Sequence, residues 1–149
     1  MQIKKYIDQF FRDITTIGGI YIYILISLWF FAIGNTHLFL QLILGAIVTF
    51  IMAVIIRLVY FKERPLKQGY INLIEKIDAS SFPSLHSARV GYMFLVIISQ
   101  YNFILMVTLL EVIGLLVCYS RIYLRKHDLI DVIGGIIFGL AVGYMIINL

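Results

Sequence analysis

The sequence predicts an all-α, integral-membrane helical bundle with about five transmembrane helices and an amphipathic helix at its N-terminus. Hydrophobic residues make up 62% of the 149 residues, and charged residues only 13%. The mean hydropathy of +0.99 implies more apolar surface than a soluble domain of this size could bury. Apolar runs close to the ~20 residues that a bilayer requires recur along the chain. The length suits a single domain over residues 1–149.

Residues 1–14 form the first predicted element. Apolar side chains such as Ile3, Ile7 and Phe10 recur at helical spacing, and charged side chains such as Lys4 and Asp8 fall on the other face. This pattern is typical of an amphipathic helix that lies in the membrane interface. A soluble cap on the bundle is the alternative.

Spanning helices are expected near residues 17–34, 38–61, 85–101, 103–120 and 129–148. The connections at 35–37 and around 100–102 are very short, which predicts antiparallel hairpins. The long connection, 62–84, carries an apolar stripe opposite charged residues, and this predicts a short amphipathic helix. That helix could cover a site as a lid, or the segment could be a plain spacer. The stripe consists of Tyr70, Leu73, Ile74 and Ile77.

All twelve Lys and Arg residues fall on one side of this layout, and the connections on the opposite side carry none. The positive-inside rule therefore puts the charged side in the cytoplasm and the C-terminus outside. Arg57, Arg64 and Arg121 are candidates for chemistry, but the other nine cations agree. The net charge of +4 suits anionic lipid headgroups. The cations cluster at segment ends, which argues against a nucleic-acid partner.

The first of three unusual clusters on the charged side is RLVYFKERP, residues 57–65. Arg57 and Arg64 are seven residues apart, which places them on one helix face about two turns from each other, and Pro65 is expected to stop that helix. Two guanidinium groups arranged in this way can bind several oxygens of one phosphate. Snorkelling anchors at a helix end are the alternative.

The second cluster is SSFPSLHS, residues 80–87. Pro83 suits the first turn of a helix and the serine before it suits the cap, so His86 would lie in the first turn. Free backbone N–H groups at that helix end favour an anion. A lone histidine that only makes hydrogen bonds at the interface is the alternative.

The third cluster is SRIYLRKHDLID, residues 120–131. His127 and Asp131 are four residues apart, so the carboxylate could hold one imidazole nitrogen and leave the other facing an electrophile. Ser120 and Arg121 could reach the same anion. A solvated charged loop is the alternative, but it does not explain an acid inside the start of the helix.

Together the clusters indicate phosphoryl transfer through a histidine nucleophile. Cations would neutralise the phosphate oxygens, one histidine would attack, and the other would protonate the leaving group. A metal fits less well, because the two histidines are far apart and no carboxylate cluster accompanies them. No metal and no cofactor are therefore expected.

The pattern resembles the type 2 phosphatidic acid phosphatase superfamily of integral-membrane lipid phosphatases. Its motifs are Lys-x6-Arg-Pro, Pro-Ser-Gly-His and Ser-Arg-x5-His-x3-Asp. The matching segments of this chain are Arg57-x6-Arg64-Pro65, Pro83-Ser84-Leu85-His86 and Ser120-Arg121-x5-His127-x3-Asp131. Arg57 replaces the usual lysine and Leu85 the usual glycine. The five expected helices are one fewer than the six of many relatives, and the layout predicts that a leading helix is the one not present.

The resemblance implies that His127 attacks phosphorus and forms a phosphohistidine, that Asp131 orients His127, and that His86 protonates the leaving oxygen. The residues implied to bind the phosphate are Arg57, Arg64, Ser84, Leu85, Ser120 and Arg121. Leu85 would contribute its main-chain N–H. If the outward-facing site of many relatives is kept, the N-terminus must lie outside, against the charge bias.

The expected function is metal-independent hydrolysis of the terminal phosphate of membrane lipid phosphates or diphosphates. Phosphatidic acid, phosphatidylglycerol phosphate and polyprenyl diphosphates are the candidate substrates. A lipid phosphotransferase with the same intermediate and a non-catalytic lipid-binding membrane protein are the alternatives. The expected partners are the lipid substrate and the bilayer. Glu111, near the middle of a spanning helix, could pack against another helix or against a second subunit of a homo-oligomer.

Overall fold

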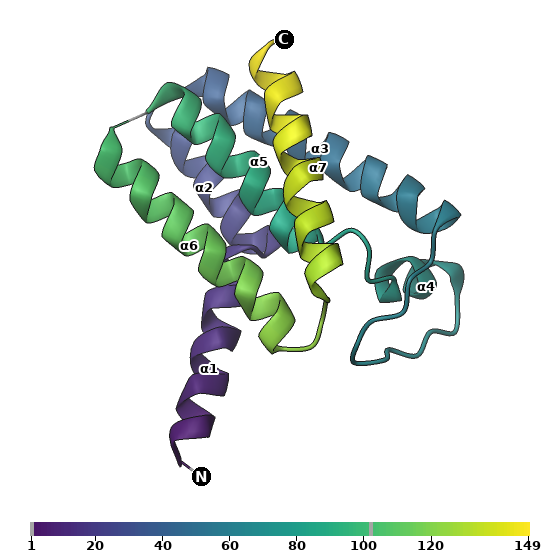
Figure 1. The fold of residues 1–149 in the computed structure, drawn as a ribbon. Coiled ribbons are helices and arrows are strands. Elements are labelled where there is room, and N and C mark those ends of the chain that lie inside the picture. The colour runs from purple at the N-terminus through teal and green to yellow at the C-terminus, as the bar shows by residue number, and fades with distance from the viewer. Residues whose placement is uncertain (1, 102) are drawn as a thin grey trace.

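In the computed structural model, residues 2–101 and 103–149 are described, and they form seven helices and no strand (Figure 1). The helices are α1 (Gln2–Ile17), α2 (Ile20–Ala32), α3 (Thr36–Val59), α4 (Leu73–Ala79), α5 (Leu85–Gln100), α6 (Ile104–Tyr123) and α7 (Leu129–Ile147). The all-α prediction is confirmed. Met1 and Asn102 lie outside the described residues, so the predicted turn around 100–102 is described only on either side of Asn102.

The predicted spans correspond to α2, α3, α5, α6 and α7, and every helix end lies within three residues of its prediction. Helices α3, α6 and α7 are long and apolar enough to cross a membrane, and α1 with α2, bent by 46°, forms a fourth candidate. Helix α5 has 16 residues, fewer than the ~20 that a bilayer requires. It is therefore suited to the interior of the bundle.

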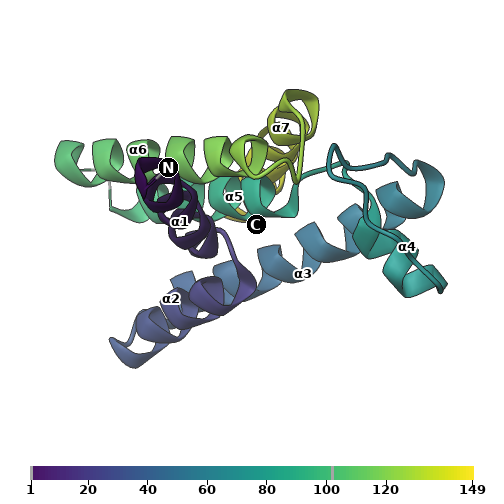
Figure 2. The ribbon, with the colours of Figure 1, turned by 90° about the horizontal axis from the view of Figure 1, so that it is seen from below.

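Helix α5 is the central element of the bundle and packs against α3, α6 and α7 (Figure 2). Its fully enclosed side chains include Tyr92, Met93 and Val96. Tyr23 of α2 and Leu42 of α3 complete the core on one side. Because α5 is surrounded, its N-terminal turn is held in a fixed place relative to the other helices.

Glycines let α5 and α7 approach each other closely. A Cβ atom at Gly139 would lie 2.1 Å from the carbonyl oxygen of Ala88, and one at Gly135 would lie 2.5 Å from that of Ser84. At the end of this contact the amide of Ser84 donates to the carbonyl of Asp131 at 3.0 Å. The first turns of α5 and α7 therefore lie side by side.

Helix α1 packs against the C-terminal part of α6 and extends away from the bundle (Figure 1). The hydroxyl of Tyr123 donates to Asp8 at 2.6 Å, and the Phe11 ring contacts the rings of Tyr119 and Tyr123. The placement of this helix in the membrane interface stays a prediction.

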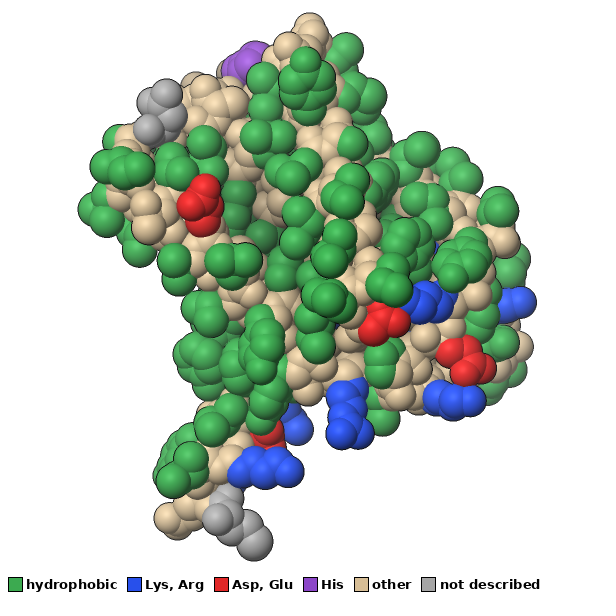
Figure 3. Space-filling model, in the orientation of Figure 1, with side chains coloured by type: hydrophobic (Ala, Val, Ile, Leu, Met, Phe, Trp, Pro, Cys, Tyr) green, Lys and Arg blue, Asp and Glu red, His purple; other side chains and the backbone are tan. Residues whose placement is uncertain are grey.

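Charged and apolar side chains separate along the molecule. In Figure 3 the Lys and Arg side chains gather at the lower end, and hydrophobic side chains cover most of the upper part. Exposed apolar residues are abundant on the helices, with Phe50, Leu115 and Tyr144 each more than half exposed. Together with helices apolar enough to span, this surface fits an integral membrane protein.

Candidate active site

A cavity of about 260 Å³ opens at the charged end of the bundle, where α3, α5 and α6 meet the loops after α3 and α6. Its lining side chains are Arg57, Arg64, Asp78, Leu85, His86, Arg89, Arg121, Lys126 and His127. Six of the nine candidate residues from the sequence line this one cavity. The three clusters therefore converge, although up to 70 positions separate them in the chain.

The path of the chain after α3 differs from the prediction. Helix α3 ends at Val59, so Arg64 lies in a loop, and the expectation that Arg57 and Arg64 share one helix face is wrong. Pro65 biases the residue before it towards an extended backbone, which is consistent with an early exit from the helix. Arg64 nevertheless reaches the cavity from this loop.

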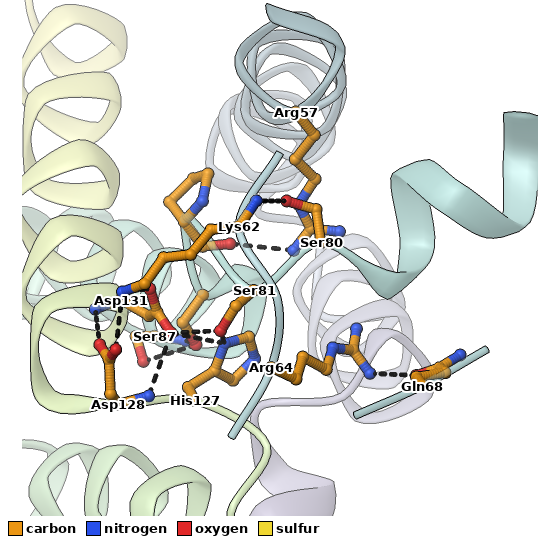
Figure 4. A network of polar contacts seen from close by, with 12 residues as sticks. Arg57, Lys62, Arg64, Gln68, Ser80, Ser81, Ser87, His127, Asp128 and Asp131 are labelled. Atoms are coloured by element: carbon orange, nitrogen blue, oxygen red, sulfur yellow. Dashed lines mark hydrogen bonds and ion pairs between the residues drawn. The ribbon is translucent and has the colours of Figure 1, made fainter. Parts of the chain in front are cut away.

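Each of the three predicted arginines is fixed by contacts at its terminal nitrogens. Arg57 donates to the carbonyl oxygens of Ile77 at 3.2 Å and Pro83 at 2.9 Å. Arg64 donates to the side chain of Gln68 at 2.6 Å (Figure 4). Arg121 donates to the hydroxyl of Thr15 at 2.8 Å. These contacts restrict the orientation of every guanidinium group.

The Nε atoms of the same three arginines are buried and have no hydrogen-bond partner within residues 2–101 and 103–149. A buried donor without a partner is destabilising by about 1–3 kcal/mol, and more when it is charged. All three side chains line the cavity. Arg57, Arg64 and Arg121 can therefore donate to an anion with several oxygens, such as a phosphoryl group.

The histidine and the acid of the third cluster are linked through a serine that the sequence analysis did not select. Asp131 Oδ2 lies 3.8 Å from His127 Nδ1, which is too far for a hydrogen bond. Ser81 Oγ lies between them (Figure 4): it donates a short hydrogen bond to Asp131 Oδ2 and lies 3.4 Å from His127 Nδ1. The expected direct contact is thus replaced by a serine bridge.

This bridge selects one tautomer of His127. The hydroxyl of Ser81 has a single hydrogen, which it gives to the carboxylate, a group that only accepts. Its oxygen can then only accept from Nδ1–H of His127. Nε2 of His127 therefore keeps its lone pair, as a nucleophile requires.

The environment of His127 also keeps the ring neutral. The side chain is buried, and this burial, followed by the positive charges of Arg121 and Arg64, lowers the pKa of His127 to about 3. Asp131 opposes the shift but does not cancel it. At neutral pH the imidazole is uncharged and can act as a nucleophile or a base.

Asp131 is completely buried and receives hydrogen bonds from several directions. Lys62 Nζ lies 2.7 Å from Oδ1, and the backbone N–H of Asp128 donates to Oδ2 at 3.0 Å. Lys62 also bonds Asp128 at 2.7 Å, and although burial acts to lower it, these hydrogen bonds raise the pKa of Lys62. Asp128 caps α7 reciprocally with Asp131. The carboxylate is therefore rigidly held.

Two predicted phosphate-binding serines lie outside the set of cavity-lining side chains. Ser84, rather than the serine before Pro83, is the N-cap of α5, and its oxygen accepts from the amide and hydroxyl of Ser87. Ser120 donates to the carbonyl oxygen of Val117 at 2.5 Å. Both hydroxyls are thus used within their own helices, and their contact with phosphate stays a prediction.

Comparison with known proteins identifies the family. The model of the PAP2 superfamily matches residues 64–149, more than half of the chain. The chain belongs to the PAP2 superfamily. The resemblance seen in the three sequence motifs is thereby confirmed.

The PAP2 chain is 31% identical over 130 residues to undecaprenyl-diphosphatase BcrC of Bacillus subtilis (strain 168). That match covers 84% of the chain and 65% of the relative, so the chain spans less than two thirds of its length.

Two solved structures share the fold. LpxE of Aquifex aeolicus has a TM-score of 0.81 at 22% identity, over 97% of this chain and 87% of that one. The PAP2-type phosphatidylglycerolphosphate phosphatase of Bacillus subtilis has a TM-score of 0.76 at 20% identity, over 96% and 76%.

Sequence reasoning missed other charged residues that line this cavity. Arg89 lines the cavity and donates to the carbonyl of Gly18 at 2.8 Å, which ties α5 to the α1–α2 junction. It follows His86 by three residues and so shares its helix face, a spacing that could have identified it. Asp78 and Lys126 also line the cavity, but neither occupies a defined position of the three motifs.

Proposed function

We propose that this PAP2 chain hydrolyses the terminal phosphate of membrane lipid phosphates or diphosphates without a metal, through a phosphohistidine at His127. One observation carries the proposal: three arginines with unpaired buried Nε donors line the same cavity as His86 and a neutral His127. The arginines would hold the phosphoryl oxygens and neutralise the charge that develops on them.

In the first step, Nε2 of His127 attacks phosphorus and the bond from phosphorus to the lipid oxygen breaks. The negative charge of the bound phosphate favours the protonated form of His86, which lines the same cavity. The protonated ring would donate its proton to the departing oxygen, so that the lipid leaves as an alcohol or as a monophosphate. His127 becomes positively charged on phosphorylation. The Ser81–Asp131 pair behind Nδ1 would stabilise that charge.

In the second step, water attacks the phosphohistidine. His86, neutral after the first step, would take a proton from this water as the phosphorus–nitrogen bond breaks. Inorganic phosphate leaves, and His127 returns to the tautomer that Ser81 selects. The arginines serve both steps, because each step places negative charge on the same oxygens.

The names of the relatives guide the choice of substrates. Undecaprenyl-diphosphatase and phosphatidylglycerolphosphate phosphatase are named for an isoprenoid diphosphate and a glycerolipid phosphate. Both carry a terminal phosphate next to a hydrocarbon-bearing group. We therefore include polyprenyl diphosphate, phosphatidylglycerol phosphate and phosphatidic acid in the proposed substrate class.

The proposed location of the site is the cytoplasmic face of the cell membrane. Seven cations that do not line the cavity lie on the same side of the layout as the cavity, and the positive-inside rule puts that side in the cytoplasm. Labelling of a cysteine introduced at exposed Lys67 with an impermeant reagent tests this, in a Cys118→Ser background. Reaction only after permeabilisation is expected, and reaction in intact cells would place the site outside.

The activity itself is tested by phosphate release from a panel of these lipids, with purified wild-type protein and His127→Ala, in the presence of a chelator. Release by the wild type and none by the variant is expected. Loss of activity in EDTA that a divalent ion restores would refute metal independence. Transfer of the phosphate to an acceptor other than water would reassign the chain as a phosphotransferase.

A further inference from the structure

A second cavity, of about 500 Å³, lies between α3, α4 and the first turn of α5, and we refer to it as the α3–α4 groove. Its apolar lining comes from Phe50 and Val54 on α3 and from Ile74 and Ile77 on α4. Figure 2 shows α4 beside the C-terminal half of α3. The volume falls within the roughly 300–1,000 Å³ typical of small-molecule sites.

The α3–α4 groove is continuous with the phosphate cavity. Arg57, Asp78 and Leu85 line both. Arg57 carries one of the unpaired Nε donors, so the boundary between the two cavities is also a boundary between cationic and apolar surface. A molecule with a phosphate at one end and a hydrocarbon chain at the other would place the phosphate on the cationic surface and the hydrocarbon on the apolar surface.

The groove opens on an exposed apolar surface. Phe50 is 60% exposed and Ile74 is 79% exposed, and both belong to its lining. Ile71, just before α4, and Leu73, its first residue, are 96% and 62% exposed and extend this apolar surface. Apolar side chains this exposed are suited to contact with lipid, so a chain can enter the groove sideways from the bilayer.

Another apolar cavity, of similar volume, lies between α5, α6 and α7 and is the competing location for the hydrocarbon chain of a substrate. Among the described residues it shares no lining side chain with the phosphate cavity. It also contains the carboxylate of Glu111, which is unfavourable beside hydrocarbon. A hydrocarbon chain bound in that cavity would therefore not be connected to the phosphate cavity.

We propose that the α3–α4 groove binds the first part of the hydrocarbon chain of the substrate, with Leu85 as the contact at the point where chain and phosphate meet. This inference rests on the proposed function and names the part of the site that distinguishes lipid phosphates from soluble ones. The bilayer is as apolar as the groove, so the groove selects by shape and by placing the phosphate, and adds little general affinity.

The kinetic test compares Val54→Trp, which fills the groove, with Leu115→Trp, a matched change in the competing cavity. Each is assayed on a long-chain lipid phosphate and on a short, water-soluble alkyl phosphate. Val54→Trp is expected to lower kcat/KM for the long-chain substrate about tenfold or more and to leave the short one within about twofold. Leu115→Trp is expected to leave both unchanged.

Equal activity of Val54→Trp and wild type on the long-chain substrate would overturn the inference, as would a selective loss in Leu115→Trp. Activity on the short phosphate shows in either case that the variant is folded and that the chemistry is intact. Failure of the wild type on every phosphate would instead refute the proposed function.

A binding measurement shows where the hydrocarbon chain of the lipid lies, independently of turnover. The probe is a non-hydrolysable lipid phosphonate with a photoreactive group in the part of the chain next to the phosphonate, incorporated with the wild-type protein in phosphatidylcholine vesicles. Crosslinks mapped to α3 and α4, around Val54 and Ile77, are expected. Crosslinks on α6 and α7 around Leu115 and Leu140, or labelling that excess unlabelled phosphonate does not reduce, would overturn the inference.

Discussion

Replacement of Ser81 by alanine removes the hydroxyl that joins His127 to Asp131. His127 Nδ1 would then face a carboxylate 3.8 Å away, too far for a hydrogen bond, and would lose the partner that selects its tautomer. An unsatisfied buried polar group of this kind costs about 1–3 kcal/mol of free energy. If this cost adds to the activation barrier, it corresponds to a roughly 5- to 150-fold loss in rate. We expect this loss in kcat, with KM for the lipid phosphate unchanged.

The assay is steady-state phosphate release, with Ser81→Thr as the matched control because threonine keeps a hydroxyl. Threonine is expected to restore most of the rate. Nitrogen NMR of the His127 ring adds a readout that a change in folding alone would not give: the wild type is expected to carry its proton on Nδ1, and the alanine variant a mixture of tautomers. Full kcat in Ser81→Ala, or a loss confined to KM, would refute the proposed bridge.

Three further predictions concern the arginines, the pKa of His127 and the helix contact. Arg121→Lys keeps a positive charge but loses Nε, so kcat/KM is expected to fall about tenfold or more; an unchanged value would remove the unpaired Nε from phosphate binding. His127 is neutral above pH about 3 and becomes charged only as the pH falls through that value, so NMR titration should show no protonation of this ring near pH 6.5. In Arg121→Gln the pKa should rise, and an unshifted value would contradict the proposed electrostatics. Gly139→Leu would push α7 away from the Ala88 carbonyl, 2.1 Å from the new Cβ atom, and should lower both the melting temperature and activity; a wild-type melting temperature would contradict the close contact.

The helices could be predicted from the sequence because lipid requires long apolar runs, and such runs remain visible without knowledge of their partners. For example, the predicted spans begin at Leu85 and Leu129, and these residues are the first of α5 and α7 in the structure. The end of α3 is harder to predict from the sequence, because Tyr60 and Phe61 continue the apolar pattern although the helix ends at Val59. There the long-range contacts of the loop, such as the Ser81 amide with the Lys62 carbonyl at 2.7 Å, decide the path of the chain.

The site could be predicted where chemistry is concentrated in short motifs, as with His86 and His127. It could not be predicted where a common residue acquires a role through contact across the fold. Ser81 and Lys62 lie 50 and 69 positions from Asp131 and are ordinary in composition, and only the packing of the loop against α7 brings them together. The α3–α4 groove has the same origin, because neither of its walls encloses a volume alone.

The most direct test of the central claim is identification of the phosphorylated residue during turnover. A polyprenyl diphosphate labelled in its terminal phosphate is mixed with His86→Ala. Its monophosphate leaving group needs little protonation, so the variant should form the intermediate and hydrolyse it slowly. The reaction is stopped in base, where phosphohistidine survives. We predict label on the peptide that contains His127, and none in a variant that also carries His127→Ala. Label on another residue, or phosphate release by His127→Ala at the wild-type rate, would contradict the account.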